Sequence, residues 1–230
     1  LNEVDKNLAI DVLKNIEMPT TRVEAWKYTR VAKLGKIAFK DDRSTLQSVS
    51  KYIIDDAAIT FVFVNGHFSE GLSTREIQAG VTFKIFSESH NGLGSQTSQL
   101  TLNGEIFNAL NTAHMTDGLL VEIDEKTEIS KPIQIIHILK GDHVISNFRT
   151  IIRAGKSSKS SIIQGFFAEN GDSNFCNNIT EIDVEENAIL TIDKIQYETE
   201  ESYHVSTEQV SQAKDSTFTL NTLTLNGGLV

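Results

Sequence analysis

Residues 180–192 decide the fold and read TEIDVEENAILTI. Acidic and apolar residues alternate over 181–184, so Ile182 and Val184 share one face and the two acids share the other. This alternation is typical of a β-strand with one buried face. A polar stretch, 185–188, separates it from the apolar residues 189–192, which predicts a loop between two strands.

The same block of strand, polar loop and strand recurs four times in the second half of the chain. The four copies are Val121–Ile136, Arg149–Ile163, Thr180–Ile192 and Ser206–Leu220. The positions taken as equivalent are Ile123, Ile152, Val184 and Val210, which lie 29, 32 and 26 residues apart. Short strands at a near-constant spacing, without helices between them, predict a solenoid whose turns stack on one another. We therefore expect a mainly β protein with a parallel β-helix over 116–230; a β-sandwich is the alternative.

Residues 1–115 are expected to form a separate, small mixed α/β region. Val4, Leu8, Val12 and Ile16 are spaced four apart, which predicts an amphipathic helix ending before Pro19. The other expected elements are a short helix from Thr21, a helix over 44–54, a strand over 59–64 with a tight turn at Asn65-Gly66, a strand over 81–86 and a helix over 104–113.

Composition excludes several classes of function. The 230 residues carry 31 acidic and 21 basic side chains, a formal net charge of -10, so nucleic acid is not expected as a partner. The longest apolar runs, 59–64 and 133–139, are far shorter than the roughly 20 residues of a membrane helix. No secretory signal is visible, and the one cysteine excludes an internal disulfide or a cysteine cage held by this chain alone. We therefore predict a cytoplasmic protein.

Two local motifs carry little chemistry. Gly155-Lys156-Ser157 resembles the end of a phosphate-binding loop, but Thr150 occupies the position where that loop needs glycine. The acidic clusters Glu185-Glu186 and Glu198-Thr199-Glu200-Glu201 lie between strand patterns, so they are predicted to be solvated loops.

Metal ligands are sought among the cysteine and the histidines. No two of the six histidines have the helical spacing of ligands on one face; they are His67, His90, His114, His137, His143 and His204. The repeat alignment places Asn178 opposite His204, so Cys176 and His204 can approach each other on adjacent turns. Sulfur and imidazole suit zinc or iron, although two ligands leave a site incomplete. A small buried cysteine near a polar histidine is the alternative.

Several segments, taken in order, resemble the SufB/SufD family of the SUF iron–sulfur cluster assembly system. They are Pro19–Thr29 (PTTRVEAWKYT), Phe63–Gly66, Leu110–Ala113 with Asp117-Gly118, Lys131–Ile133, Asn178–Ala188 and Gly227–Val230. The Trp-Lys-Tyr run at 26–28 and the absence of a long cysteine-bearing insertion favour the SufD branch, while a SufB-type subunit remains open.

The resemblance implies a right-handed parallel β-helix after an N-terminal helical region, in a non-catalytic scaffold subunit. It implies SufB and the SufC ATPase as partners, and an iron–sulfur cluster held transiently at the interface of the full-length complex. Relatives continue beyond Val230, and the cluster-forming and ATPase-docking residues lie in that further part, so no cofactor is expected on this chain. An uncapped solenoid edge would favour self-association, for example as a homodimer.

Two other functions are weighed beside this one. The first is an exported β-helix enzyme acting on acidic polysaccharides, which would carry paired carboxylates or calcium ligands on one exposed face. The chain shows neither an export signal nor a repeated acidic triplet. The second is a stand-alone binding module, which only an identified ligand would distinguish.

Overall fold

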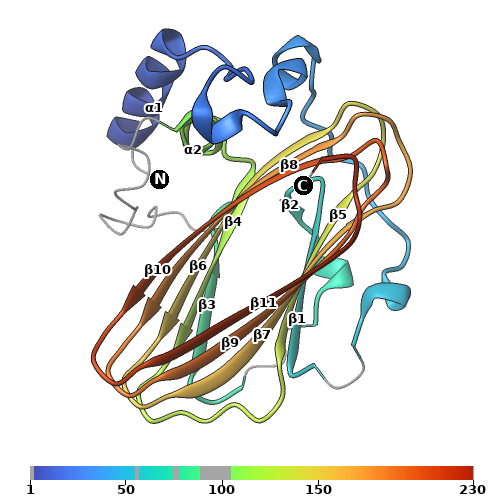
Figure 1. The fold of residues 1–230 in the computed structure, drawn as a ribbon. Helices are drawn as coiled ribbons and strands as arrows, with labels where there is room; N and C mark the ends of the chain where they lie inside the picture. The colour runs from blue at the N-terminus through green and yellow to red at the C-terminus, as the bar shows by residue number, and fades with distance from the viewer. Residues whose placement is uncertain (1–2, 55–56, 75–77, 89–104, 230) are drawn as a thin grey trace.

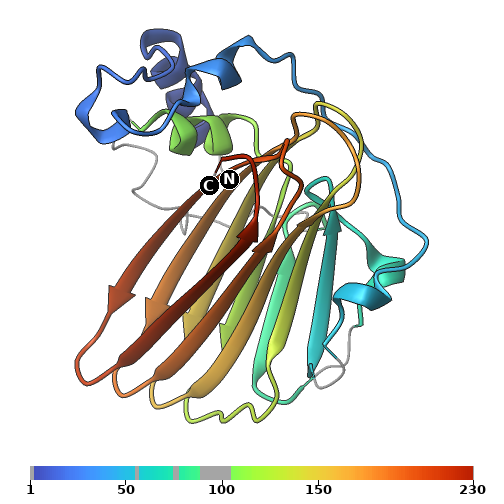
Figure 2. The ribbon, with the colours of Figure 1, turned by 45° about the vertical axis from the view of Figure 1, so that its right-hand side comes forward.

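A computed structural model describes residues 3–54, 57–74, 78–88 and 105–229. The strands form two facing β-sheets, and the chain passes from one sheet to the other and back four times (Figure 1). Figure 2 shows the strands stacking along one axis, from β2 and β3 at one end to β10 and β11 at the other. The predicted parallel β-helix with a small N-terminal helical region is confirmed.

The helices and short 3-10 helices are α1 (Glu3–Asn15), η1 (Glu24–Trp26), η2 (Val31–Lys36), η3 (Ser50–Tyr52), η4 (Glu70–Leu72) and α2 (Ile106–Ala113). The strands of the first sheet are β1 (Ile59–Val64), β2 (His67–Phe68), β5 (Ile133–Leu139), β7 (Lys159–Ala168), β9 (Ile189–Tyr197) and β11 (Thr217–Asn226). The strands of the second sheet are β3 (Val81–Ile85), β4 (Asp117–Ile123), β6 (Ile145–Ala154), β8 (Phe175–Val184) and β10 (Tyr203–Gln212).

Strand direction excludes the β-sandwich alternative. Strands β4, β6, β8 and β10 pair in parallel in one sheet, and β1, β5, β7, β9 and β11 do so in the other. Among the strands of the described residues, only the first ones add antiparallel pairs, β2 on β1 and β3 on β4. Parallel neighbours in both sheets, with consecutive strands in opposite sheets, are the topology of a solenoid rather than of antiparallel Greek keys.

The register corrects the repeat alignment. The residues that stack on one another are Val121, Ile152, Ile182 and Val210, so successive turns lie 31, 30 and 28 residues apart. The predicted equivalents Ile123 and Val184 are each two residues too far along. A shift of two keeps a side chain on the same face, so alternation by itself does not detect the error.

Four β-turns connect the second sheet to the first, at 124–127, 155–158, 185–188 and 213–216, and we call this side the corner end. In each, the amide of the fourth residue donates to the carbonyl of the first, at 3.0–3.3 Å. The third residue has a positive φ of 57–58°: Lys126, Ser157, Asn187 and Asp215. That geometry matches a type II turn. Gly155-Lys156-Ser157 is therefore one copy of this corner.

The opposite side, which we call the loop end, has connections at 140–144, 169–174 and 198–202. Helix α2 lies against the outer face of the second sheet there (Figure 1). Asn111 Nδ2 donates to the carbonyls of Phe148 and Asn177, at 2.8 and 2.9 Å. Arg149 is fully buried beneath the helix and donates to Thr112 Oγ1 at 2.8 Å. These contacts fix the helical region on the solenoid.

Two predicted helices differ from the structure. The stretch over 44–54 contains only the short η3, and it packs Val49 on the outer face of the first sheet. Gln134 holds its backbone by donating to Tyr52 O at 2.7 Å and accepting from Ile54 N at 3.0 Å. The expected helix from Thr21 is the single 3-10 turn η1, which has no side-chain cap.

The remaining predicted elements are present. Helices α1 and α2, strands β1 and β3 and the Asn65-Gly66 hairpin turn all lie where expected. Both turn residues have a positive φ, as a tight hairpin of this kind requires. The helices of the described residues include none that is long and apolar enough to cross a membrane.

Candidate functional site

Cys176 and His204 lie side by side inside the solenoid. Each is the second residue of its strand, and the parallel register of β8 and β10 pairs them directly. Both residues are 3% exposed. Asn178, predicted to lie opposite His204, pairs with Ser206 instead. The corrected register therefore brings Cys176 closer to His204 than the repeat alignment did.

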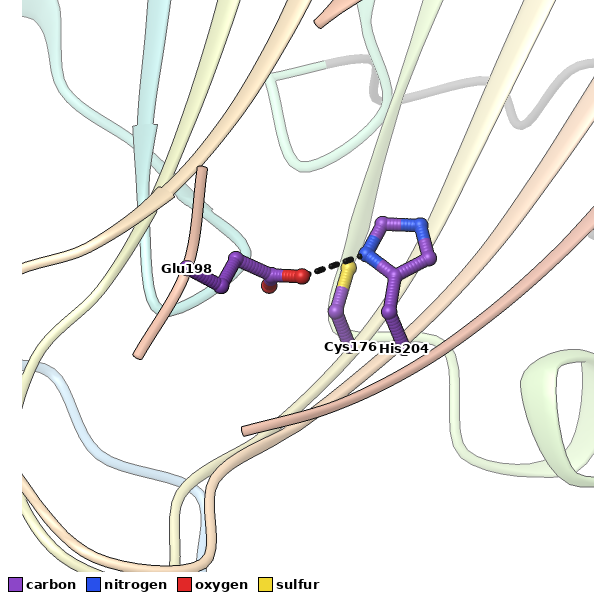
Figure 3. A group of neighbouring side chains, drawn as sticks. All are labelled: Cys176, Glu198 and His204. Atoms are coloured by element: carbon purple, nitrogen blue, oxygen red, sulfur yellow. Dashed lines mark hydrogen bonds and ion pairs between the residues drawn. The ribbon is translucent and has the colours of Figure 1, made fainter. Parts of the chain in front are cut away.

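Glu198 reaches the same place from the opposite sheet (Figure 3). It follows directly after β9 and continues that strand's inward alternation beyond Lys194 and Gln196, all three of which are buried. The turn that follows Glu198 is closed by two hydrogen bonds. The amide of Ser202 donates to Thr199 O at 3.0 Å, and the side-chain hydroxyls of Thr199 and Ser202 are 2.8 Å apart.

The three side chains form a compact donor group. One donor atom from each of Cys176, Glu198 and His204 lies within 4.8 Å of the other two. His204 Nδ1 is 2.9 Å from Glu198 Oε2, and Gln196 Nε2 donates to that same oxygen at 2.7 Å. His204 Nε2 is buried without a hydrogen-bond partner among the described residues. Sulfur, nitrogen and carboxylate oxygen together are a ligand set that suits zinc.

Burial controls the protonation of the thiol. Desolvation raises the pKa of Cys176 well above its usual value, and the charge of Glu198 raises it further. In the absence of a bound cation, Cys176 is therefore a neutral thiol at physiological pH, inert as a nucleophile.

A second polar group lies next to the first, toward the middle of the same interior. Lys194 Nζ donates to Glu208 Oε1 at 2.8 Å and to Ser206 Oγ at 2.5 Å. The Lys194 side chain is only 7% exposed, so its ammonium group lies inside the solenoid, where the Glu208 carboxylate neutralises it. The polar interior thus extends over two adjacent turns.

His137 lies beside the Lys194 group, within a row of aromatic rings. Its ring stacks on Phe63 and Phe166, with centroids 5.4 and 4.7 Å away, and meets Phe148 edge-on at 4.6 Å. Neither of its nitrogens has a hydrogen-bond partner among the described residues. Burial, with smaller effects from His204 and Lys194, lowers the pKa of His137 to about 3, so the ring is neutral and acts as a core residue.

The other histidines do not join the donor group. His67 Nε2 lies 2.6 Å from Asp41 Oδ1 on the outside of the solenoid, and His114 and His143 are exposed. His90 lies outside the described residues.

The acidic cluster at 198–201 shows what the sequence prediction missed. Glu200 and Glu201 are exposed, as expected for a solvated loop, but that prediction is wrong for Glu198, which is 3% exposed. The alternation of Leu190, Ile192, Lys194 and Gln196 would have placed Glu198 on the inner face. The pattern was missed because its last inward positions, from Lys194 to Glu198, are polar or charged rather than apolar.

Comparisons with known proteins cover nearly the whole chain. Residues 1–135 match the family model described as "SufBD protein N-terminal region", and residues 137–230 match "SUF system FeS cluster assembly, SufBD core domain". The iron-sulfur cluster assembly SufBD family protein slr0076 of Synechocystis sp. is 26% identical over an alignment of 240 residues, and this alignment covers 96% of this chain and 53% of that protein. The chain thus spans about half the length of the curated relative it matches.

Proposed function

The chain belongs to the SufBD family of the SUF iron–sulfur cluster assembly system, and on that basis we propose that it is part of a non-catalytic scaffold subunit on which iron–sulfur clusters are assembled. The observation that carries the proposal is the match of two consecutive family models, which together span all but one residue of the chain. The cluster is the cargo of such a scaffold rather than a resident cofactor.

The partners follow from the same premise. We propose that the whole protein acts in the cytoplasm with a SufB homologue and with a SufC ATPase, whose hydrolysis of ATP reshapes the scaffold. The cluster would be held transiently between the two SufBD-family subunits. The SufD-like features of residues 26–28 support the SufD position in this assembly, although the family models and the relative carry the joint name SufBD.

The fold supports a scaffold role in a physical sense. Parallel strands pair from β4 to β10 in one sheet and from β1 to β11 in the other, and hydrogen bonds between successive corners, such as Ser157 N to Glu186 O at 2.9 Å, continue the ladder outside the strands. Each turn is therefore held to its neighbours by backbone contacts. Such a subunit would move as one body when the ATPase rearranges the assembly.

A deletion in the native host tests the proposed role. Loss of the gene should lower the activity of iron–sulfur enzymes per amount of their polypeptides, and the wild-type gene should restore it. Deletion of the SufC homologue serves as the control, since it shows that the host depends on this system. If that control strain loses activity and the strain without this gene does not, the proposal is wrong.

A further inference from the structure

The strongest unassigned feature is the donor group of Cys176, Glu198 and His204 inside the last two turns. We propose that these three side chains bind one divalent metal ion of the zinc type, with a water molecule as fourth ligand. The proposal does not depend on the proposed function, because it rests on the geometry of the described residues alone.

The first argument is that the solenoid does not need ionisable residues at this place. Cys176 stacks on Ser146 one turn earlier, in a parallel register without a break. Phe167 pairs with Tyr197, and the residues that follow them are Ala168 and Glu198. Ala168 is therefore the equivalent of Glu198 one turn earlier. Serine and alanine thus fill the matching positions at the loop end one turn earlier, so the fold tolerates small neutral side chains where the donor group supplies a thiol and a carboxylate.

The second argument is the electrostatic balance of the site. A thiolate, a carboxylate and a neutral imidazole carry a total charge of minus two, which a divalent cation neutralises. A neutral site has the lowest cost of burial in a medium of low dielectric constant. Because the thiolate rather than the thiol is the metal ligand, binding would release the proton of the thiol.

The third argument is the orientation of the ligands. Ligand atoms around a tetrahedral zinc ion lie about 3.5 Å apart, so donors within 4.8 Å need only small side-chain rotations. Gln196 holds the Glu198 carboxylate in place, as outer partners of metal ligands do. Within the part of the chain that the structure describes, His204 Nε2 is buried without a hydrogen-bond partner, so hydrogen bonds do not fully account for this imidazole.

A cobalt titration tests the site in the full-length protein. Metal-depleted protein should bind Co²⁺ with the appearance of a near-ultraviolet thiolate-to-cobalt charge-transfer band, and Zn²⁺ should remove that band by competition. Cys176→Ser should lose the band. Gln196→Ala, which changes only the outer partner, should keep it and weaken binding by about 10-fold.

The matched control is Ser146→Ala, a change of similar size at the neighbouring inward position of the same ladder. It should titrate as the wild type does. If the wild type and Cys176→Ser give the same spectra and stoichiometry, the proposal is wrong. Should Cys176→Ser fail to fold, Glu198→Gln keeps the shape and decides the question: unchanged affinity contradicts the proposal, and a loss of at least about 10-fold supports it. Either result leaves the family assignment unaffected.

Discussion

The corner end and the loop end of the solenoid enclose different interiors. At the corner end, Ile133, Ile162 and Ile192 stack directly on one another, and all three are buried in one apolar core. At the loop end, the inward ladder of Ser146, Cys176 and His204 changes its chemistry at every turn. The comparison teaches that a repeated residue marks a position serving the fold, whereas a changing one marks a position open to other roles.

The largest effect is expected from truncation at the corner end. Ile162 is fully buried between Ile133 and Ile192, so no neighbour can fill the space that Ile162→Ala would leave. The variant should lose about 3 kcal/mol of unfolding free energy in urea denaturation. Ser146→Ala at the loop end is the comparison and should lose less than about 1 kcal/mol. Equal losses of unfolding free energy in the two variants would contradict the proposed difference between the corner end and the loop end.

The next effect concerns His137, where the aromatic row meets the polar interior. Its pKa of about 3 lies below the value of 6.5 for an unperturbed histidine, so between these values the unfolded chain binds a proton that the folded chain does not. Stability is therefore complete above pH 6.5 and falls as the pH drops, by about 2 kcal/mol between pH 7 and pH 5.

His137→Phe should remove this part of the pH dependence, since a phenyl ring suits the stack with Phe63 and Phe166 and has no unpaired nitrogens. Unfolding free energies at pH 7 and pH 5 measure the effect. His114→Gln, a change at an exposed histidine, should keep the wild-type difference. A full pH-dependent loss in His137→Phe would mean that other groups cause it.

The smallest effect is expected at the corners themselves. Asn187 has a φ of 58° and is exposed, with its amide donating to Lys214 O at 3.2 Å. Asn187→Val should lose about 1–2 kcal/mol, because a branched side chain disfavours this backbone conformation. Asn187→Gly keeps the conformation available and should stay within about 0.5 kcal/mol of the wild type. Thermal unfolding of the two variants checks the difference.

The sequence predicts the strands better than their register for a physical reason. Alternating β-branched residues, as in 180–184, reveal strands because one buried face has a period of two. The same period hides the register, which is why Ile123 and Val184 were aligned two residues from their true equivalents. The corners carry Lys, Ser, Asn and Asp at the positive φ position, so no repeated glycine marked them.

Residues whose environment comes from distant segments escaped prediction. Arg149 is buried because α2 covers it, and no pattern in the sequence around Arg149 predicts this contact. The stretch over 44–54 has helical spacing, but Gln134 and the outer face of the first sheet bind it in another conformation. Within the candidate site, the repeat alignment predicted that Cys176 and His204 lie close together. It could not predict Glu198, which follows a strand of the opposite sheet, because the alignment compares only equivalent strands.

The central claim is that this solenoid belongs to an iron–sulfur assembly scaffold, and its partners test that claim most directly. The full-length protein, tagged at its native locus, would be isolated without oxygen and its companions identified by mass spectrometry. We predict recovery of a second SufBD-family protein and a SufC-type ATPase in stoichiometric amounts. Recovery of neither, from cells in which both are expressed, would contradict the account.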